Sequence, residues 1–165
     1  MERLVVKDHI IPFVPCDQLF DQYGFKRTGS TTAALIDFTH TVGTMLETSS
    51  CVRCLLIAFS KAIDIVDHLK LVNKLEQYGL SHSFITLIVS FLTDRLQYTK
   101  AGSNLSRLQF ITCSIFQDSG IAPCLFVIMI LNLKAGAAMS RMAKYADDAT
   151  LLVPELTSLS IEEEF

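Results

Sequence analysis

Apolar side chains recur at helical spacing in three parts of the chain. The first follows Ser30, which can cap a helix, as can either threonine after it, and it continues through residues 33–46. The second begins near Asp67 and ends at Gly79, a residue that suits a helix C-terminus. The third covers residues 83–92. The pattern predicts a helix in each place.

Other stretches have patterns that are typical of strands. Residues 52–59 are a nearly continuous apolar run, as expected of a strand covered on both faces. Residues 97–100 and 108–112 favour two strands joined by a polar turn. Alternating residues on either side of Asp147 and Asp148 suit a hairpin over residues 142–153 with both acids at its turn.

The longest apolar run, residues 125–133, follows Pro123 and is well short of the roughly 20 residues that a membrane-spanning helix needs. We interpret it as a buried core helix. Because helices and strands intermix along the chain, we expect an α+β or α/β fold. The N-terminus has no export signal, so an intracellular location, in the cytoplasm or the nucleus, and no membrane contact are expected.

Composition supports a globular domain, with 50% hydrophobic and 19% charged residues. The net charge of −3 argues against a strong stand-alone nucleic-acid binder, because phosphate neutralisation supplies most non-specific affinity. The acidity is concentrated in a tail, residues 154–165, and the rest of the chain is nearly neutral. The lone pair Cys51 and Cys54 lacks partners for a zinc site, so we expect buried, reduced thiols.

Two adjacent carboxylates between apolar runs are the chemical feature that needs an explanation. Asp147 and Asp148 at a hairpin tip can share a hard divalent cation such as Mg²⁺. Two-metal phosphoryl transfer also needs a further carboxylate from another strand. An isolated Asp-Asp pair is usually a solvated turn, so the pair alone does not define a metal site.

Three other stretches accompany Tyr145-Ala146-Asp147-Asp148 in a fixed order. They are QYGFKRTGSTT at residues 22–32, LIAFSKAIDIVDH at residues 56–68 and IFQDSGIAPCLF at residues 115–126. Together they resemble the QFGFRKGRSTT, LLDFSKAFDTVDH, VPQGSVLGPLLF and Asp-Asp hairpin segments of the reverse transcriptases of LINE-type (non-LTR) retrotransposons. The resemblance extends from about Met1 to Val153.

The resemblance implies an RNA-directed DNA polymerase with an RNA template and a DNA primer as partners, and Mg²⁺ or Mn²⁺ as cofactor. The implied fold is a polymerase palm, an antiparallel sheet packed against helices, at about residues 51–153, with a remnant of the fingers at about residues 1–50. It also implies roles for individual residues: metal binding and catalysis by Asp147 and Asp148, nucleotide binding by Phe59, Ile63 and Gln117, and nucleic-acid binding by Lys26 and Arg27.

The departures from the family pattern predict defective catalysis. Ala58 stands where the family has the remaining metal-binding aspartate, and a methyl group cannot bind Mg²⁺. Asp64 is retained, but it matches a different aspartate of the family. Ile63 replaces an aromatic residue that resembles a steric gate, and Asp118 replaces a glycine that lets backbone and nucleotide approach closely. The thumb that follows the hairpin in the family is expected to be missing, so the chain is interpreted as truncated.

Several alternatives stay open. The leading interpretation is a defective polymerase fragment. The alternatives are an active polymerase, a non-catalytic domain derived from a reverse transcriptase that binds nucleic acid or a protein, and a decayed fragment whose product is unstable. Lys26 and Arg27 are equally well explained as a solvated pair before a helix. Phe110 and Phe116 are expected in the core rather than in a base-stacking platform, and Tyr98 fits either role.

Overall fold

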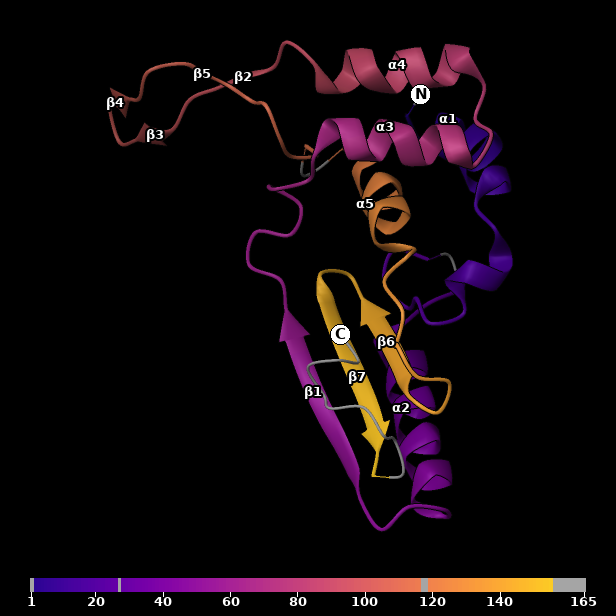
Figure 1. Ribbon diagram of the computed structural model, residues 1–165. Helices are drawn as coiled ribbons and strands as arrows, with labels where there is room; N and C mark the ends of the chain where they lie inside the picture. The colour runs from indigo at the N-terminus through magenta and orange to yellow at the C-terminus, as the bar shows by residue number, and fades with distance from the viewer. Residues whose placement is uncertain (1, 27, 117–118, 156–165) are drawn as a thin grey trace. The chain divides into compact units, whose positions relative to one another are not determined.

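A computed structural model describes residues 2–26, 28–116 and 119–155 of this chain, and it has a mixed α+β architecture with small antiparallel sheets (Figure 1). The chain divides into two compact units, each built from two separate stretches. One contains residues 1–14 and 61–129, and the other contains residues 15–60 and 130–165. The expected division into fingers and palm near residue 50 stays a prediction.

The first unit is mainly helical. Its elements are α1 (Glu2–Val5), the π-helical turn η1 (Val6–Ile10), the 3-10 turn η2 (Ile11–Phe13), α3 (His68–Gln77), α4 (His82–Leu92), the short strands β2 (Leu96–Gln97), β3 (Lys100–Ala101), β4 (Asn104–Leu105) and β5 (Gln109–Phe110), and α5 (Ala122–Ile130).

The ends of α3 form where the sequence predicts them. The Asp67 carboxylate accepts a hydrogen bond from Lys70 N at 3.1 Å, so Asp67 is the N-cap. At the other end, Gly79 has a φ of 77°, and Leu80 N donates to Leu75 O at 3.2 Å. This is the glycine-terminated helix end that the sequence favours.

The predicted core helix is confirmed in α5, although it ends at Ile130 rather than at residue 133. Leucines and isoleucines on one side of α3 and α4 are also buried, as their spacing predicts. The buried apolar side chains of these three helices include Leu71, Leu75, Ile85, Ile88, Leu92, Leu125, Phe126 and Ile128.

The expected strands near residues 97–112 are four two-residue strands. β2 pairs with β5 and β3 with β4, with Gly102 at φ 62° in the turn. The expectation that Phe110 lies in the core is wrong, because its side chain is 70% exposed. A two-stranded ribbon buries neither of its faces by itself. Phe116 is half-buried and packs edge-to-face on Phe91 at 5.6 Å.

The second unit contains a three-stranded antiparallel sheet with the strand order β1-β7-β6. Its elements are the 3-10 turn η3 (Cys16–Leu19), α2 (Thr31–Leu46), β1 (Val52–Ala58), β6 (Arg141–Tyr145) and β7 (Asp148–Pro154). The Ser30 hydroxyl accepts from Ala33 N at 3.0 Å, which confirms the predicted start of α2.

One face of this sheet forms an apolar cluster. Met142 of β6 packs with Leu151 and Val153 of β7, and Leu133 from the preceding connection packs against them. α2 contacts all three strands (Figure 1).

The expectation that both faces of β1 are covered is wrong. Leu56 is 76% exposed, because β1 is an edge strand of the sheet and α2 only partly covers it. Cys51 and Cys54 are exposed, so the expected buried thiols are also wrong at these positions.

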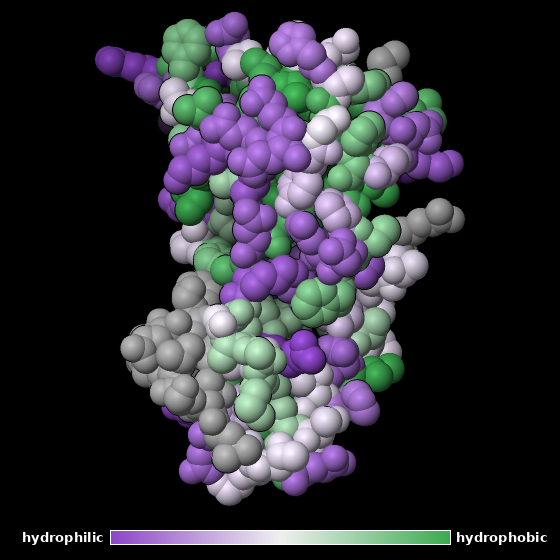
Figure 2. All heavy atoms as spheres, turned by 45° about the vertical axis from the view of Figure 1, so that its right-hand side comes forward, coloured by the Kyte–Doolittle hydropathy of each residue, from purple (hydrophilic) through white to green (hydrophobic). Residues whose placement is uncertain are grey.

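Hydrophobic side chains reach the surface in several places, and Figure 2 shows them interspersed with hydrophilic ones over one face. Within the part of the chain that the structure describes, no helix has the length and apolar character needed to cross a membrane.

Candidate functional site

The Asp pair lies at the tip of the β6–β7 hairpin, as predicted. Tyr145 pairs with Asp148, so Ala146 and Asp147 form a two-residue turn. Ala146 has a φ of 54°, the left-handed conformation that the first residue of such turns adopts. Both aspartates are exposed. Their carboxylates are therefore accessible to a ligand from solvent.

The end of β1 lies beside this tip. Ala58 is directly opposite Asp148 in the antiparallel register, and Phe59 N donates to Asp147 O at 3.4 Å. Side chains directly opposite each other point to the same face, with Cβ atoms about 5 Å apart. Ala58, Asp148 and Tyr145 therefore form one row across the three strands.

An apolar groove of about 310 Å³ runs beside this row, between α2 and the sheet. Leu56 and Thr150 are the next opposite pair on the same face of β1 and β7, and they line the groove together with Leu35 and Phe38 of α2. Asp148 and Tyr145 line the same groove. The groove therefore places apolar surface beside one carboxylate.

Residues 21–23 support the hairpin from the β6 side. Lys144 N donates to Asp21 O at 2.7 Å, and Tyr23 N donates to Lys144 O at 2.8 Å, so this segment lies parallel to β6. A Cβ added to Gly24 would overlap the backbone of Ala146. A side chain is therefore excluded at Gly24 by the close approach of the turn.

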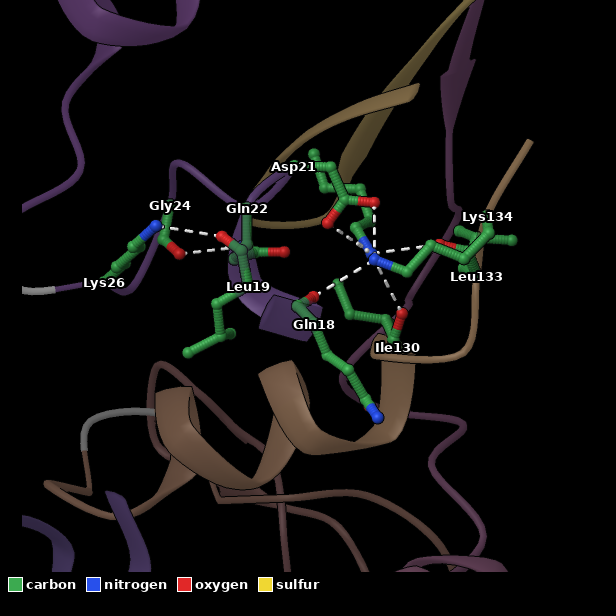
Figure 3. A network of polar contacts seen from close by, with 10 residues as sticks. Gln18, Leu19, Asp21, Gln22, Gly24, Lys26, Ile130, Leu133 and Lys134 are labelled. Carbon is green, nitrogen blue, oxygen red and sulfur yellow. Dashed lines mark hydrogen bonds and ion pairs between the residues drawn. The ribbon is translucent and has the colours of Figure 1, made fainter. Parts of the chain in front are cut away.

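Lys144 is buried and lies immediately before Tyr145-Ala146-Asp147-Asp148 in the sequence. Its ammonium group is 3.1 Å from Asp21 Oδ1 and donates to the carbonyls of Leu133 at 3.0 Å and Ile130 at 3.3 Å. Lys134 forms a second ion pair with Asp21 Oδ2 at 2.9 Å (Figure 3). Lys144 and Asp21 are both almost fully buried. Each neutralises the charge of the other, and burial of either charge alone would be strongly unfavourable.

Tyr23 continues this polar region towards α2. Burial raises the pKa of its phenol to about 12, and a hydrogen bond to Asp37 together with the negative charges of Asp37 and Asp21 adds to the effect. The neutral phenol is therefore the form that the folded protein favours. Tyr23 also borders the groove beside Asp148.

The other sequence-predicted site residues are divided between the two units or lie outside the described residues. Ile63 belongs to the first unit, where its carbonyl accepts from Ile115 N at 3.1 Å. Lys26 donates to the Leu19 carbonyl at 2.9 Å, so its ammonium group already has a backbone partner (Figure 3). Arg27, Gln117 and Asp118 lie outside the described residues.

Sequence reasoning missed the residues that hold the hairpin in place, namely Asp21, Gly24 and Lys144. One signal was available, because Gly24 between two aromatic residues indicates a close backbone approach. No comparable signal linked Lys144 to Asp21, since a lysine in an alternating strand is normally exposed.

As to metal binding, the residues that the structure describes contain no group of three or more histidine, cysteine, aspartate or glutamate side chains that could hold an ion. Asp147 and Asp148 provide two carboxylates, and Ala58 provides a methyl group beside them. This is an incomplete donor set for a two-metal centre.

Comparisons with known proteins do not assign the chain to a family. Neither the scan against protein-family models nor the search of curated proteins finds a match.

Proposed function

We propose that this chain is a reverse transcriptase palm with part of the fingers, derived from a non-LTR retrotransposon, and that it has lost polymerase catalysis. The observation that carries the proposal is the position of Ala58 directly opposite Asp148. Two of the four sequence motifs contain Ala58 and the Asp pair, and the strand pairing is consistent with these residues belonging to one site.

The chemistry of phosphoryl transfer explains the expected defect. In a complete centre, Mg²⁺ bound by three carboxylates would stabilise charge on the reacting phosphate. Here the residue on β1 is Ala58, so one carboxylate is absent from the row that contains Asp148. We expect a rate loss of about 100-fold or more from this change alone.

The exposure of the two aspartates also explains why they alone would hold a cation weakly. Asp147 and Asp148 are exposed, and water competes for a cation at an exposed site. A third carboxylate on β1 would add charge on the same face as Asp148. The natural chain is therefore expected to bind Mg²⁺ or Mn²⁺ weakly.

Primer extension tests the proposal with four forms of the chain: the natural sequence, Asp147→Ala, the double variant Ala58→Asp/Asp118→Gly, and the same double variant with Asp147→Ala. We expect template-dependent incorporation of deoxynucleotides only by the double variant. Incorporation by the natural chain that disappears with Asp147→Ala would show that the centre is complete without a carboxylate at residue 58, and would contradict the proposed defect.

A further inference from the structure

Residues 95–110 form a ribbon, here called the arm, that begins just after α4 (Figure 1). Leu96 pairs with Phe110, and Lys100 pairs with Leu105. Between these pairs the ribbon continues through Thr99, whose N–H donates to the Ser106 hydroxyl at 2.8 Å. Every residue from 93 to 110 is exposed.

The arm exposes a group of apolar side chains. Leu96 is directly opposite Phe110, so these two side chains share a face, and Tyr98 and Leu108 follow next to this pair, just outside β2 and β5. These four side chains are between 50% and 70% exposed. An uncovered ribbon of this kind is only marginally stable in water, which favours a binding partner.

The charge of the arm is opposite to that of the chain. Arg95, Lys100 and Arg107 are its charged residues, and residues 95–110 contain no acid, whereas the whole chain has a net charge of −3. The Arg95 guanidinium lies over the rings of Phe91 and Phe116, at 5.6 and 5.4 Å, which holds this charge at the base of the arm. The partner that complements the arm is therefore anionic.

We propose that the arm binds single-stranded nucleic acid. Exposed aromatic rings on a strand stack against unpaired bases, and cations along the same ribbon pair with phosphates. Tyr98 and Phe110 supply the rings, and Lys100 and Arg107 supply charge. The inference does not use Asp147 or Asp148, and it stands if the proposed polymerase ancestry fails.

The arm fits an anionic membrane less well. A loop that inserts into a bilayer needs apolar side chains at its tip, whereas the tip of the arm is Gly102-Ser103-Asn104. Its apolar residues lie along the side of the ribbon instead, where a nucleic-acid strand can follow them.

Fluorescence anisotropy with labelled oligo-dT and oligo-U tests the proposal on the full chain. Two phosphate contacts, by Lys100 and Arg107, predict that log K falls with log salt concentration with a slope of about −1.4. Tyr98→Ala and Phe110→Ala should each weaken binding by about tenfold or more. Lys100→Glu/Arg107→Glu should weaken it further and flatten the salt dependence.

Matched controls lie in the same unit. Phe13→Ala removes another exposed ring, and Lys70→Glu reverses an exposed charge on α3. Both should leave oligonucleotide binding unchanged. Circular dichroism would verify that each variant is folded.

Three results would overturn the proposal. The first is no oligonucleotide binding at low salt, and the second is an equal loss of oligonucleotide affinity in the arm variants and the controls. The third is that the chain binds anionic phosphatidylserine vesicles instead of oligonucleotides, and that the arm variants abolish this vesicle binding. The last result would assign the arm to a membrane surface.

Discussion

Ala58 lies directly opposite Asp148 in the register of β1 and β7. Phe59, the next residue, donates its backbone N–H to Asp147 O at 3.4 Å. Two parts of the chain that are distant in sequence therefore meet at the hairpin tip. The hairpin tip has the carboxylates of Asp147 and Asp148, and the methyl group of Ala58 on β1 lies beside them.

Gly24 should be essential for the position of the hairpin turn. In Gly24→Ala the new methyl group would overlap the Ala146 backbone, which cannot move away without disturbing β6 and β7. We expect a loss of about 1–3 kcal/mol in the free energy of unfolding, measured with urea. Gly43→Ala in α2 is the matched control, because nothing lies near an added Cβ there and alanine favours helices. Equal stability of Gly24→Ala and the natural chain would contradict the packing described.

Removal of one partner from the buried ion pair between Lys144 and Asp21 should strongly destabilise the folded chain. Asp21→Asn leaves the Lys144 ammonium buried without its counter-charge, for which we expect a destabilisation of about 3–5 kcal/mol. Asp17→Asn, at an exposed position in η3, should have almost no effect. The double variant Asp21→Leu/Lys144→Met should recover much of the loss, because it buries no charge. If Asp21→Asn unfolds at the same urea concentration as Asp17→Asn, the pair is not buried as described.

Tyr23 should make stability fall at high pH. Its pKa is raised from 10.0 to about 12 in the folded chain, mainly by burial, so the folded state holds the phenolic proton more tightly than the unfolded state. This contribution is fully present below about pH 10 and is lost as the pH rises towards 12. The tyrosinate absorbance of the natural chain minus that of Tyr23→Phe should titrate near pH 12. A difference that titrates near pH 10 would contradict the burial of the phenol.

Local signals in the sequence predict the secondary structure well. Ser30 and Asp67 cap helices where expected, and Gly79 ends α3 in the left-handed conformation. These features depend on a few neighbouring residues, so the sequence contains the information directly. The same holds for the 141–154 hairpin, whose alternation places Asp147 in the turn.

Tertiary features could not be predicted in the same way. The apolar run of β1 has no alternation from which to assign its faces, and its edge position leaves Leu56 exposed. Phe110 is exposed because, among the described residues, nothing forms a second layer over its two-stranded ribbon. Lys144 is buried because Asp21, far away in the sequence, reaches it. Each outcome depends on a partner that local patterns do not identify.

Binding of Mn²⁺, followed by electron paramagnetic resonance, tests the central claim most directly, because it needs neither a primer nor a complete polymerase. Ala58→Asp places a third carboxylate opposite Asp148, and Ala58→Asn is its uncharged control. We expect Ala58→Asp to bind Mn²⁺ at least about tenfold more tightly than the natural chain and than Ala58→Asn, and to lose this gain with Asp147→Ala. Equal affinity of Ala58→Asp and Ala58→Asn would contradict the account, because residue 58 would then not belong to a metal site.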